Sequence, residues 1–347
     1  SHGLLFRVDV SGRTDKQRSA VLSKINATSA PPLSSEMVRR QLIDLGIELP
    51  SRQSKSKASV RPMQGDGSAY RQISGRVPQW WLKVASMEGA HLRWPFKVSR
   101  VVLDLTPANM ERALRTRSRQ DKRGLSLVWA LPPLVREGDL PWFARAIEEL
   151  RRQGENTFQI GHIGQMALFT DLGRDKALGD VKIYGDYSCN VLNTPALRQY
   201  AQAGLCGVQL SLEIERATLQ QMQAHRMQAA QRDEAVGMQL GMYVYGHPPL
   251  FSARLDAPHF QGQRGFVSSR GERYCLERRP EAIYAYSHSA YSLLAHVQEL
   301  PRLGIDYFVV DISRGGDKRE NAAVTALLHG RGELPEVFAG NFTGTLL

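Results

Sequence analysis

The sequence has few cysteines and lacks the short motifs that identify common hydrolases and nucleotide-binding folds. Its three cysteines, Cys189, Cys206 and Cys275, are too few for a disulfide framework and form no CxxC pair. We therefore expect a reducing, cytoplasmic location and no structural zinc site. There is no HExxH helix, no GxSxG nucleophile turn and no Walker A loop. No run of about 18 apolar residues is present, so the sequence predicts no membrane-spanning helix.

Acidic residues are outnumbered by basic ones. The chain has 45 Lys and Arg residues against 34 Asp and Glu residues, a formal net charge of +11. Such an excess favours a polyanionic partner such as RNA, although a soluble basic surface explains it equally well. The charge is concentrated in a Ser-rich stretch at 52–61 and in one short helix with its exit. We expect that helix to bind RNA through Arg112, Arg115, Arg117, Arg119, Lys122 and Arg123.

The chain divides into two parts by composition. Residues 1–77 are polar, with one strand candidate (LLFRVDV) and one helix candidate (SSEMVRRQLIDLG) that Gly46 ends. They predict a small α+β segment, the tail of a middle domain, followed by a linker. The chain starts without an initiator Met, so we expect it to be cut from a longer protein. Residues 78–347 have a different pattern and predict a separate barrel domain.

From residue 78 onward, short apolar runs alternate with amphipathic helical stretches. Runs that are apolar on both faces suit parallel strands covered by helices, and strand–helix alternation predicts an α/β fold with βαβ units. Helices are expected at about 107–119, 139–153, 194–204, 214–233 and 289–303. Strands are expected at 98–105, 125–131, 156–163, 180–188, 207–212, 236–246 and 305–312.

These seven strands come close to the eight of a (β/α)8 TIM-barrel-like domain. An eighth candidate lies at YCLER (274–278) or AIYAY (282–286). An open doubly wound sheet is the alternative, but no GxGxxG loop follows the first predicted strand.

Functional groups of a barrel come from the C-terminal ends of its strands. That rule selects acidic, basic and imidazole side chains at several predicted strand ends, although polar strand ends facing water need no function. Asp186 and Glu213 lie on neighbouring predicted strands and are able to form a carboxylate pair for acid–base chemistry; an ion pair with Arg254 or Arg314 explains them equally well. His247 and Asp311 end two further strands, but their spacing demands no metal. We expect Asp186, Glu213, His247 and Asp311 to be catalytic.

The stretch MYVYGHPPLFSARL, residues 242–255, begins as a buried strand and breaks at Gly246. Proline donates no N–H, so the two prolines that follow His247 prevent the strand from continuing its ladder. A plain turn accounts for the break. The Tyr, His and Arg around it also suit the rim of a binding site.

Several blocks resemble peptidase family U32, the collagenase-like peptidases. They are GDYSCNVLN (185–193), GVQLSLEIE (207–215), YVYGHPPLFSARL (243–255), SSRGERYCLERR (268–279) and the closing GNFTGTLL (340–347). The resemblance covers about 97–347 and implies the C-terminal barrel half of a long member. Relatives hydroxylate bases in ribosomal or transfer RNA, or help to hydroxylate ubiquinone precursors, so the resemblance implies an RNA-modifying hydroxylase rather than a protease.

The resemblance also implies a pocket for a small anionic ligand or a nucleotide. Arg254, Arg270 and Arg314 would bind a carboxylate or phosphate through bidentate hydrogen bonds from their guanidinium groups. The residues it implies for substrate binding are Tyr187, Asn190, Ser211, Tyr245, Arg254, Arg270, Arg314 and Asn341.

The sequence departs from that family at the iron–sulfur cluster. Relatives hold it on four cysteines, two of them in the segment that matches YGHPPLFSARL, which has none here. We therefore expect no cofactor in this chain, and a cluster elsewhere in a longer protein. Three functions stay open: the substrate-binding barrel of an RNA hydroxylase, a non-catalytic RNA-binding module, and a peptidase, for which no nucleophile–base pair or metal motif is visible.

Overall fold

The computed structural model describes residues 77–344, except 87–88, 90–93, 118–125, 171–180, 232–236, 255–263, 269–270, 280–281, 315–321, 323, 327 and 329–336. All of these described residues belong to the second of the two units into which the chain divides, residues 66–347. The small α+β segment predicted for 1–77 lies outside them except for its last residue.

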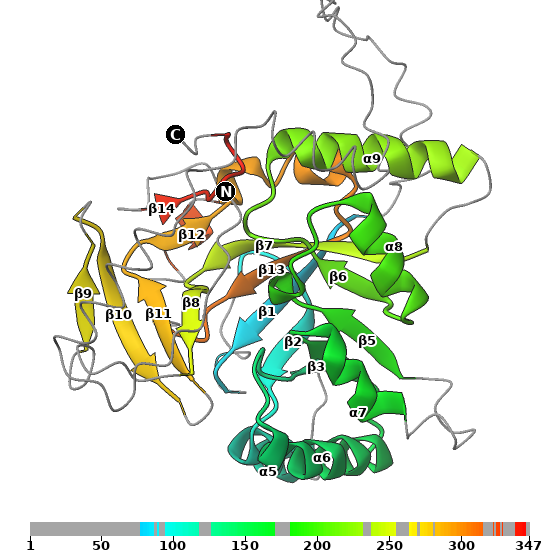
Figure 1. Ribbon diagram of the computed structural model, residues 1–347, viewed down its shortest axis with the longest axis vertical. Coiled ribbons are helices and arrows are strands. Elements are labelled where there is room, and N and C mark those ends of the chain that lie inside the picture. The colour runs from blue at the N-terminus through cyan, green and yellow to red at the C-terminus, as the bar shows by residue number, and fades with distance from the viewer. Residues whose placement is uncertain are drawn as a thin grey trace, which may run out of the picture. The chain divides into compact units, whose positions relative to one another are not determined.

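Eight parallel strands close into a barrel (Figure 1). The first strand pairs with the last, Gln79 opposite Tyr307, and the last strand also pairs with the seventh, Phe308 opposite Met242. This closure confirms the predicted TIM-barrel-like fold and excludes an open doubly wound sheet. The strands are β1 (Gln79–Val84), β2 (Val98–Asp104), β3 (Ser126–Ala130), β4 (Thr157–Ile160), β5 (Lys182–Gly185), β6 (Gly207–Gln209), β7 (Gln239–Gly246) and β13 (Tyr307–Asp311).

Helices cover the outside of the barrel as the βαβ pattern predicts. They are α5 (Pro107–Arg117), α6 (Leu140–Arg152), α7 (Ala167–Thr170), α8 (Thr194–Gln202) and α9 (Arg216–Gln231). In α6, Phe143, Ala146, Ile147 and Leu150 are buried, which is the i, i+3, i+4, i+7 stripe of a helix lying on a sheet. Asn193 begins α8 by accepting a hydrogen bond from the Ala196 N–H at 2.8 Å.

Large side chains fill the barrel interior near the N-terminal ends of the strands. The rings of Trp81 and Tyr307 stack with centroids 4.1 Å apart. The Arg100 guanidinium lies over Trp81 and Tyr184, 4.9 Å and 5.0 Å from their centroids. Cation–π contacts of this kind stabilise a buried guanidinium. The interior is therefore a packed core at this level, and open space for a ligand lies nearer the other end.

Two sequence predictions were wrong. The eighth barrel strand is β1, QWWLKV, and not YCLER or AIYAY, whose residues lie in a separate antiparallel sheet. The predicted helix at 289–303 is a short strand, β12 (Ala290–Ser292), followed by 3-10 turns at Leu294–His296 and Leu300–Leu303. Pro301 has no N–H for an α-helical bond to the carbonyl of Val297, which favours the tighter turns.

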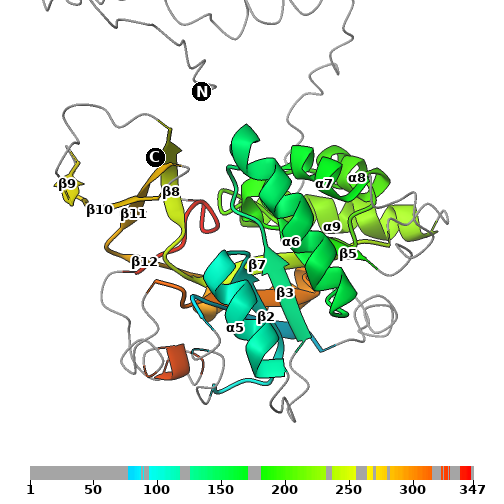
Figure 2. The same cartoon turned by 90° about the horizontal axis from the view of Figure 1, so that it is seen from below.

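Between β7 and β12 the chain forms an inserted sheet of four antiparallel strands. In spatial order they are β8 (Pro249–Ala253), β11 (Ile283–Ser287), β10 (Arg273–Arg278) and β9 (Gly265–Val267). The arrowheads of β1, β7 and β13 point toward this sheet, and the view turned by 90° also shows it beside the barrel (Figures 1 and 2). The inserted sheet therefore lies over the C-terminal mouth, where a barrel carries its working residues.

Gly246 explains why the strand breaks at GHPP. Its φ is +143°, and a Cβ at this position would lie 2.3 Å from the Tyr243 hydroxyl and 2.4 Å from the Asp311 carbonyl oxygen. Only glycine fits such a conformation this close to another strand. Pro249 then starts β8, a strand position that proline tolerates. The break is the point where the chain leaves the barrel for the inserted sheet.

None of the described helices combines the length and the apolar character needed to cross a bilayer.

Candidate functional site

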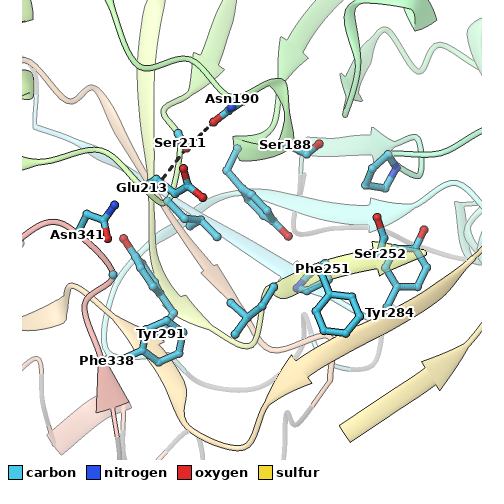
Figure 3. A pocket seen from close by; sticks show the side chains of 16 residues that line it. Ser188, Asn190, Ser211, Glu213, Phe251, Ser252, Tyr284, Tyr291, Phe338 and Asn341 are labelled. Carbon is cyan, nitrogen blue, oxygen red and sulfur yellow. Dashed lines mark hydrogen bonds between the residues drawn. The ribbon is translucent and has the colours of Figure 1, made fainter. Parts of the chain in front are cut away.

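A pocket with a volume of about 400 Å³ opens at the C-terminal mouth (Figure 3). Three parts of the chain form it. The barrel rim contributes Pro133, Tyr187, Ser188, Asn190, Ser211, Leu212 and Glu213; the inserted sheet contributes Pro249, Leu250, Phe251, Ser252 and Tyr284; and the C-terminal part contributes Tyr291, Phe338, Gly340 and Asn341. Pockets of this size, mostly apolar with a few polar groups, are typical of small-molecule sites.

One wall of the pocket is polar. After β5 the chain makes a 3-10 turn, Tyr187–Cys189, and Asn190 follows it in the left-handed region at φ 54°. The Ser211 hydroxyl donates to the Asn190 side-chain oxygen at 2.8 Å, and the Glu213 N–H donates to the Ser211 hydroxyl at 3.2 Å. These bonds fix Asn190 and Ser211, so the Asn190 amide and the Glu213 carboxylate stand on a rigid rim.

The other wall is aromatic. Tyr284 and Tyr291 are 2% and 1% exposed, and the rings of Tyr291 and Phe338 meet edge to face with centroids 5.6 Å apart. The Tyr291 hydroxyl is buried, and within the described residues no hydrogen-bond partner reaches it. A buried hydroxyl without a partner costs about 1–3 kcal/mol. In Figure 3 this hydroxyl is directed toward the Asn341 side of the pocket.

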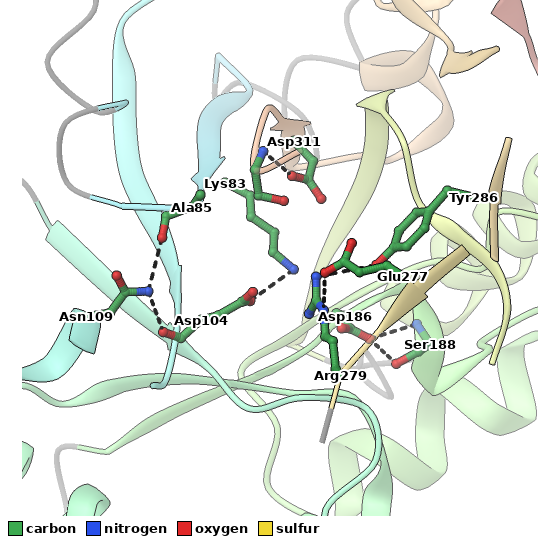
Figure 4. Close-up of polar contacts among 11 residues, drawn as sticks. Lys83, Ala85, Asp104, Asn109, Asp186, Ser188, Glu277, Arg279, Tyr286 and Asp311 are labelled. Carbon is green, nitrogen blue, oxygen red and sulfur yellow. Dashed lines mark hydrogen bonds and ion pairs between the residues drawn. The ribbon is translucent and has the colours of Figure 1, made fainter. Parts of the chain in front are cut away.

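An ionic cluster lies on the floor of the mouth beside this pocket (Figure 4). Lys83 from β1 forms an ion pair with Asp104 from β2, with Nζ 3.3 Å from Oδ1. Burial alone would lower the pKa of Lys83, but the carboxylates of Asp104, Asp311 and Asp186 outweigh it and hold the pKa above its usual value. Lys83 is therefore a permanent ammonium ion among three carboxylates from three different strands.

The inserted sheet covers this cluster with further charges. Glu277 accepts a hydrogen bond from Arg279 at 2.7 Å and another from Arg314, which follows β13. The Arg314 guanidinium also lies over the ring of Tyr286. These contacts attach the inserted sheet to the rim of the barrel and close one side of the mouth.

Asp186 connects the ionic cluster to the pocket. Its carboxylate accepts the Ser188 N–H at 2.7 Å and contacts the Ser188 hydroxyl, which also lies 2.7 Å from the Gly161 carbonyl oxygen. Burial raises the pKa of Asp186, and the bonds from Ser188 and the charge of Lys83 oppose that rise only in part. Ser188 also lines the pocket, so its side chain links the carboxyl group of Asp186 to the pocket wall.

Tyr187 stands between the two sites. Burial, together with the charges of Asp186 and Asp311, raises the pKa of its hydroxyl well above the usual value. The group therefore stays a neutral donor at any ordinary pH. Its ring meets Tyr243 edge to face with centroids 5.2 Å apart, which holds it in place.

The structure brings together part of the residues selected from the sequence. Glu213, Tyr187, Asn190, Ser211 and Asn341 line the pocket, and Asp186 and Asp311 belong to the ionic cluster. The others lie elsewhere: Tyr245 is buried opposite Ser292, His247 has Nδ1 3.4 Å from the Ser287 carbonyl oxygen, Arg254 is exposed after β8, and Arg314 binds Glu277. Arg270 lies outside the described residues.

The basic helix is α5. Arg112 and Arg115 are exposed on it, and Arg115 pairs with Glu111. The helix starts just after the C-terminal end of β2 and leads back toward the start of β3, so its last turn lies away from the pocket. The side chain of Arg117 and all of Arg119, Lys122 and Arg123 fall outside the described residues.

The cysteines do not fit a four-cysteine cluster. Cys189 is buried near the end of β5, and burial raises the pKa of its thiol to about 12. Cys206 lies just before β6, at the opposite end of the barrel from the pocket, as predicted. Cys275 is on β10 with its thiol 3.7 Å from the Tyr286 carbonyl oxygen. The described residues also contain no group of three His, Cys, Asp or Glu side chains placed to hold a metal ion.

Sequence reasoning missed several residues of this site. Lys83 belongs to the one barrel strand that was not predicted, and its position near the end of QWWLKV was the available signal. Tyr284, Tyr291 and Phe338 come from the inserted sheet and from the segments after it, and apolar periodicity does not assign such residues to a pocket.

No protein-family model matches the sequence, and no curated protein is similar to it. Several solved structures match the chain at low similarity. The U32 peptidase Mk0906 is 10% identical with a TM-score of 0.39, over 69% of this chain and 94% of that one. The spore cortex-lytic enzyme SleL of Bacillus cereus is 7% identical with a TM-score of 0.36, over 73% and 74%. The chitinase-like agglutinin of Robinia pseudoacacia is 11% identical with a TM-score of 0.33, over 72% and 98%. Similarity at this level says nothing about the chemistry of the site.

Proposed function

We propose that this chain is the substrate-binding barrel of an enzyme that hydroxylates RNA bases, and that the pocket holds one unpaired base. The observation that carries the proposal is Tyr291, a residue that lines the pocket and whose buried hydroxyl has no partner within the described residues. Buried polar groups in proteins are almost always satisfied, so a polar atom of a ligand is the natural partner for it.

The make-up of the pocket suits a nucleobase. Flipped or unstacked bases are held between aromatic rings and recognised by hydrogen bonds along their edges. Here Tyr284, Tyr291 and Phe338 supply the rings, while Asn190 and Glu213 supply a donor and an acceptor on the facing wall. A volume of about 400 Å³ is sufficient for a base with its ribose.

Charge favours a nucleic acid over a neutral metabolite. The net charge of +11 attracts polyanions, and the resemblance to family U32 is the reason for naming base hydroxylation as the reaction. Hydroxylation is an oxidation and requires a redox centre. The positions of Cys189, Cys206 and Cys275 do not fit a cluster, so the proposal places that centre in another part of a longer protein or in a partner.

The residues of this chain would bind the base and donate or accept protons during the reaction. Asp186 is the candidate acid, because it is buried, its pKa is raised, and Ser188 links it to the pocket. Lys83 would hold the surrounding carboxylates in place. A peptidase is less well supported: Ser188 and Ser211 are hydrogen-bonded to Asp186, Gly161 and Asn190 and not to a histidine, and a Cys189 thiol of pKa about 12 is no nucleophile.

Calorimetric titration with the four nucleoside 5′-monophosphates tests the proposal. We expect one of them to bind, and Tyr291→Phe to weaken its binding by about tenfold through loss of one hydrogen bond. The same substitution should leave the melting temperature of the free protein equal or higher, because it removes a buried hydroxyl without a partner.

Glu213→Gln tests the polar wall, and Glu215→Gln is the matched control because Glu215 is exposed two residues away and does not line the pocket. We expect the first to weaken binding by about tenfold or more, since it removes a hydrogen bond to a charged acceptor, and the second to change nothing. Absence of binding by all four nucleotides, together with binding of a dipeptide, would replace this proposal by the peptidase function.

A further inference from the structure

The inserted sheet has a second face, which borders the pocket at Phe251. Side chains alternate along a strand, and Cys275, Tyr284 and Tyr286 face Leu134 of the barrel in a small apolar cluster. Their neighbours therefore point the other way. In the strand register Phe266 is opposite Tyr274, and Phe251 is opposite Ala285, which places these aromatic residues on the outer face.

Three rings on this outer face form an aromatic row. Phe266 and Tyr274 are stacked, with centroids 4.9 Å apart and an interplanar angle of 13°. Phe251 lies next to Phe266 with a centroid distance of 6.1 Å, and 41% of Phe251 is exposed. Phe251 also borders the pocket, so the row starts where the pocket ends.

The strand ends beside the aromatic row are basic. Arg254 follows β8 and Arg264 precedes β9, and both are exposed. The two acidic residues of the described part of this sheet are already engaged: Glu272 accepts from Ser268 and Tyr274, and Glu277 binds Arg279 and Arg314. Glu272 keeps its charge, because its donors are neutral hydroxyls, but Arg254 and Arg264 outweigh it, so the net charge beside the row is positive and suits a polyanion.

We infer that the aromatic row and its flanking arginines bind a single-stranded segment of RNA adjoining the base in the pocket. This inference rests on the proposed function and adds the surface that holds the strand. Proteins hold single strands by combining a positive surface that follows the backbone with aromatic rings on which successive bases stack. The three rings and the two arginines, Arg254 and Arg264, provide both parts, and Phe251 makes the surface continuous with the pocket.

Fluorescence anisotropy with a labelled, unstructured RNA octamer tests the inference on the full chain. We expect the octamer to bind at least tenfold more tightly than the mononucleotide. Phe266→Leu keeps an apolar side chain and removes the ring; it should weaken octamer binding about tenfold and leave mononucleotide binding unchanged. Arg254→Gln combined with Arg264→Gln should reduce the slope of log K against log salt by about 1.4, because each single-strand phosphate contact contributes about 0.7.

Arg198→Gln is the matched control, since it removes one exposed charge from α8, which lies far from the inserted sheet in both views (Figures 1 and 2). It should leave both affinities unchanged. If the mononucleotide binds but the octamer gains nothing, or if the sheet variants behave like Arg198→Gln, this inference is wrong and the pocket proposal stands. If neither RNA nor mononucleotide binds, the proposed function fails as well.

Discussion

Lys83 and Asp104, on adjacent parallel strands, form an ion pair with Nζ 3.3 Å from Oδ1. Their side chains are 21% and 33% exposed to solvent. Because solvent screens a partly exposed ion pair, this pair by itself contributes little to stability. Its importance comes from the neighbours, because the same ammonium group also faces the carboxylates of Asp186 and Asp311. One lysine thus faces the carboxyl groups at three strand ends and offsets part of their negative charge.

Lys83→Met should lower the free energy of unfolding by about 3–5 kcal/mol at pH 7, because it leaves buried carboxylates without a cation. In the variant the charge of Lys83 no longer opposes the rise that burial causes in the pKa of Asp186, so this carboxylate destabilises the fold increasingly as the pH rises. The difference from the wild type should therefore shrink between pH 7 and pH 5. Urea unfolding at both pH values measures it, with the exposed Lys97→Met as control. If the stability difference between Lys83→Met and the wild type does not change with pH, Lys83 does not offset the charge of these carboxylates.

Asp186→Asn should gain stability relative to the wild type as the pH rises from 4 to 8. The pKa of Asp186 is raised by burial, so its contribution is present below the unfolded pKa and is lost as the pH rises through the folded pKa. Asparagine does not ionise and still accepts the Ser188 N–H. Asp139→Asn is the comparison of opposite sign, because the hydrogen bond from Arg136 lowers the pKa of Asp139. Parallel pH profiles for the two variants would refute the interpretation.

Gly246→Ala should destabilise the barrel by several kcal/mol, since the new Cβ would lie about 2.4 Å from the Asp311 carbonyl at a φ of +143°. Gly237→Ala, near the start of the same strand, is the control, because a Cβ there meets nothing within 4 Å. Thermal unfolding followed by circular dichroism separates the two. Equal melting temperatures would mean that β7 does not turn out of the barrel at Gly246.

An anaerobically purified sample of this chain should contain no iron or sulfide at cluster stoichiometry, because its cysteines lie on different elements. Colorimetric iron and sulfide assays measure this directly. A sample of any longer parent protein is the positive comparison. Iron and sulfide at cluster stoichiometry in this chain would overturn the argument from Cys189, Cys206 and Cys275.

The barrel was predictable because its signal is local. Seven strands were found from apolar runs, and VSRVVLDL, for example, buries Val101, Val102 and Leu103 completely. The eighth was missed because QWWLKV directly follows a long polar stretch of the sequence. YCLER and AIYAY were correctly read as extended, but an apolar run does not reveal which sheet it joins. That choice depends on contacts between distant segments.

The site was predictable only where it follows the strand ends. Asp186, Ser211 and Glu213 were found by that rule, and they lie at the mouth. Tyr291 and Phe338 were not, because their place in the pocket depends on β12 (Ala290–Ser292) pairing with β14 (Val337–Phe338) and with the end of β7. The aromatic wall therefore depends on how distant strands pair, whereas the residues of the polar wall follow the ends of strands that the sequence predicts.

The pairing of Gln79 with Tyr307 sets an order for events on the ribosome. The first strand of the barrel is synthesised long before the last, so β1 and β7 remain open edges while the inserted sheet, which follows β7 in the chain, is synthesised. Open strand edges attract other chains, and pairings distant in sequence form slowly. A chain interrupted before residue 305 would therefore expose both edges permanently. Such fragments should aggregate through these edges, and synthesis of the last strand should remove this tendency.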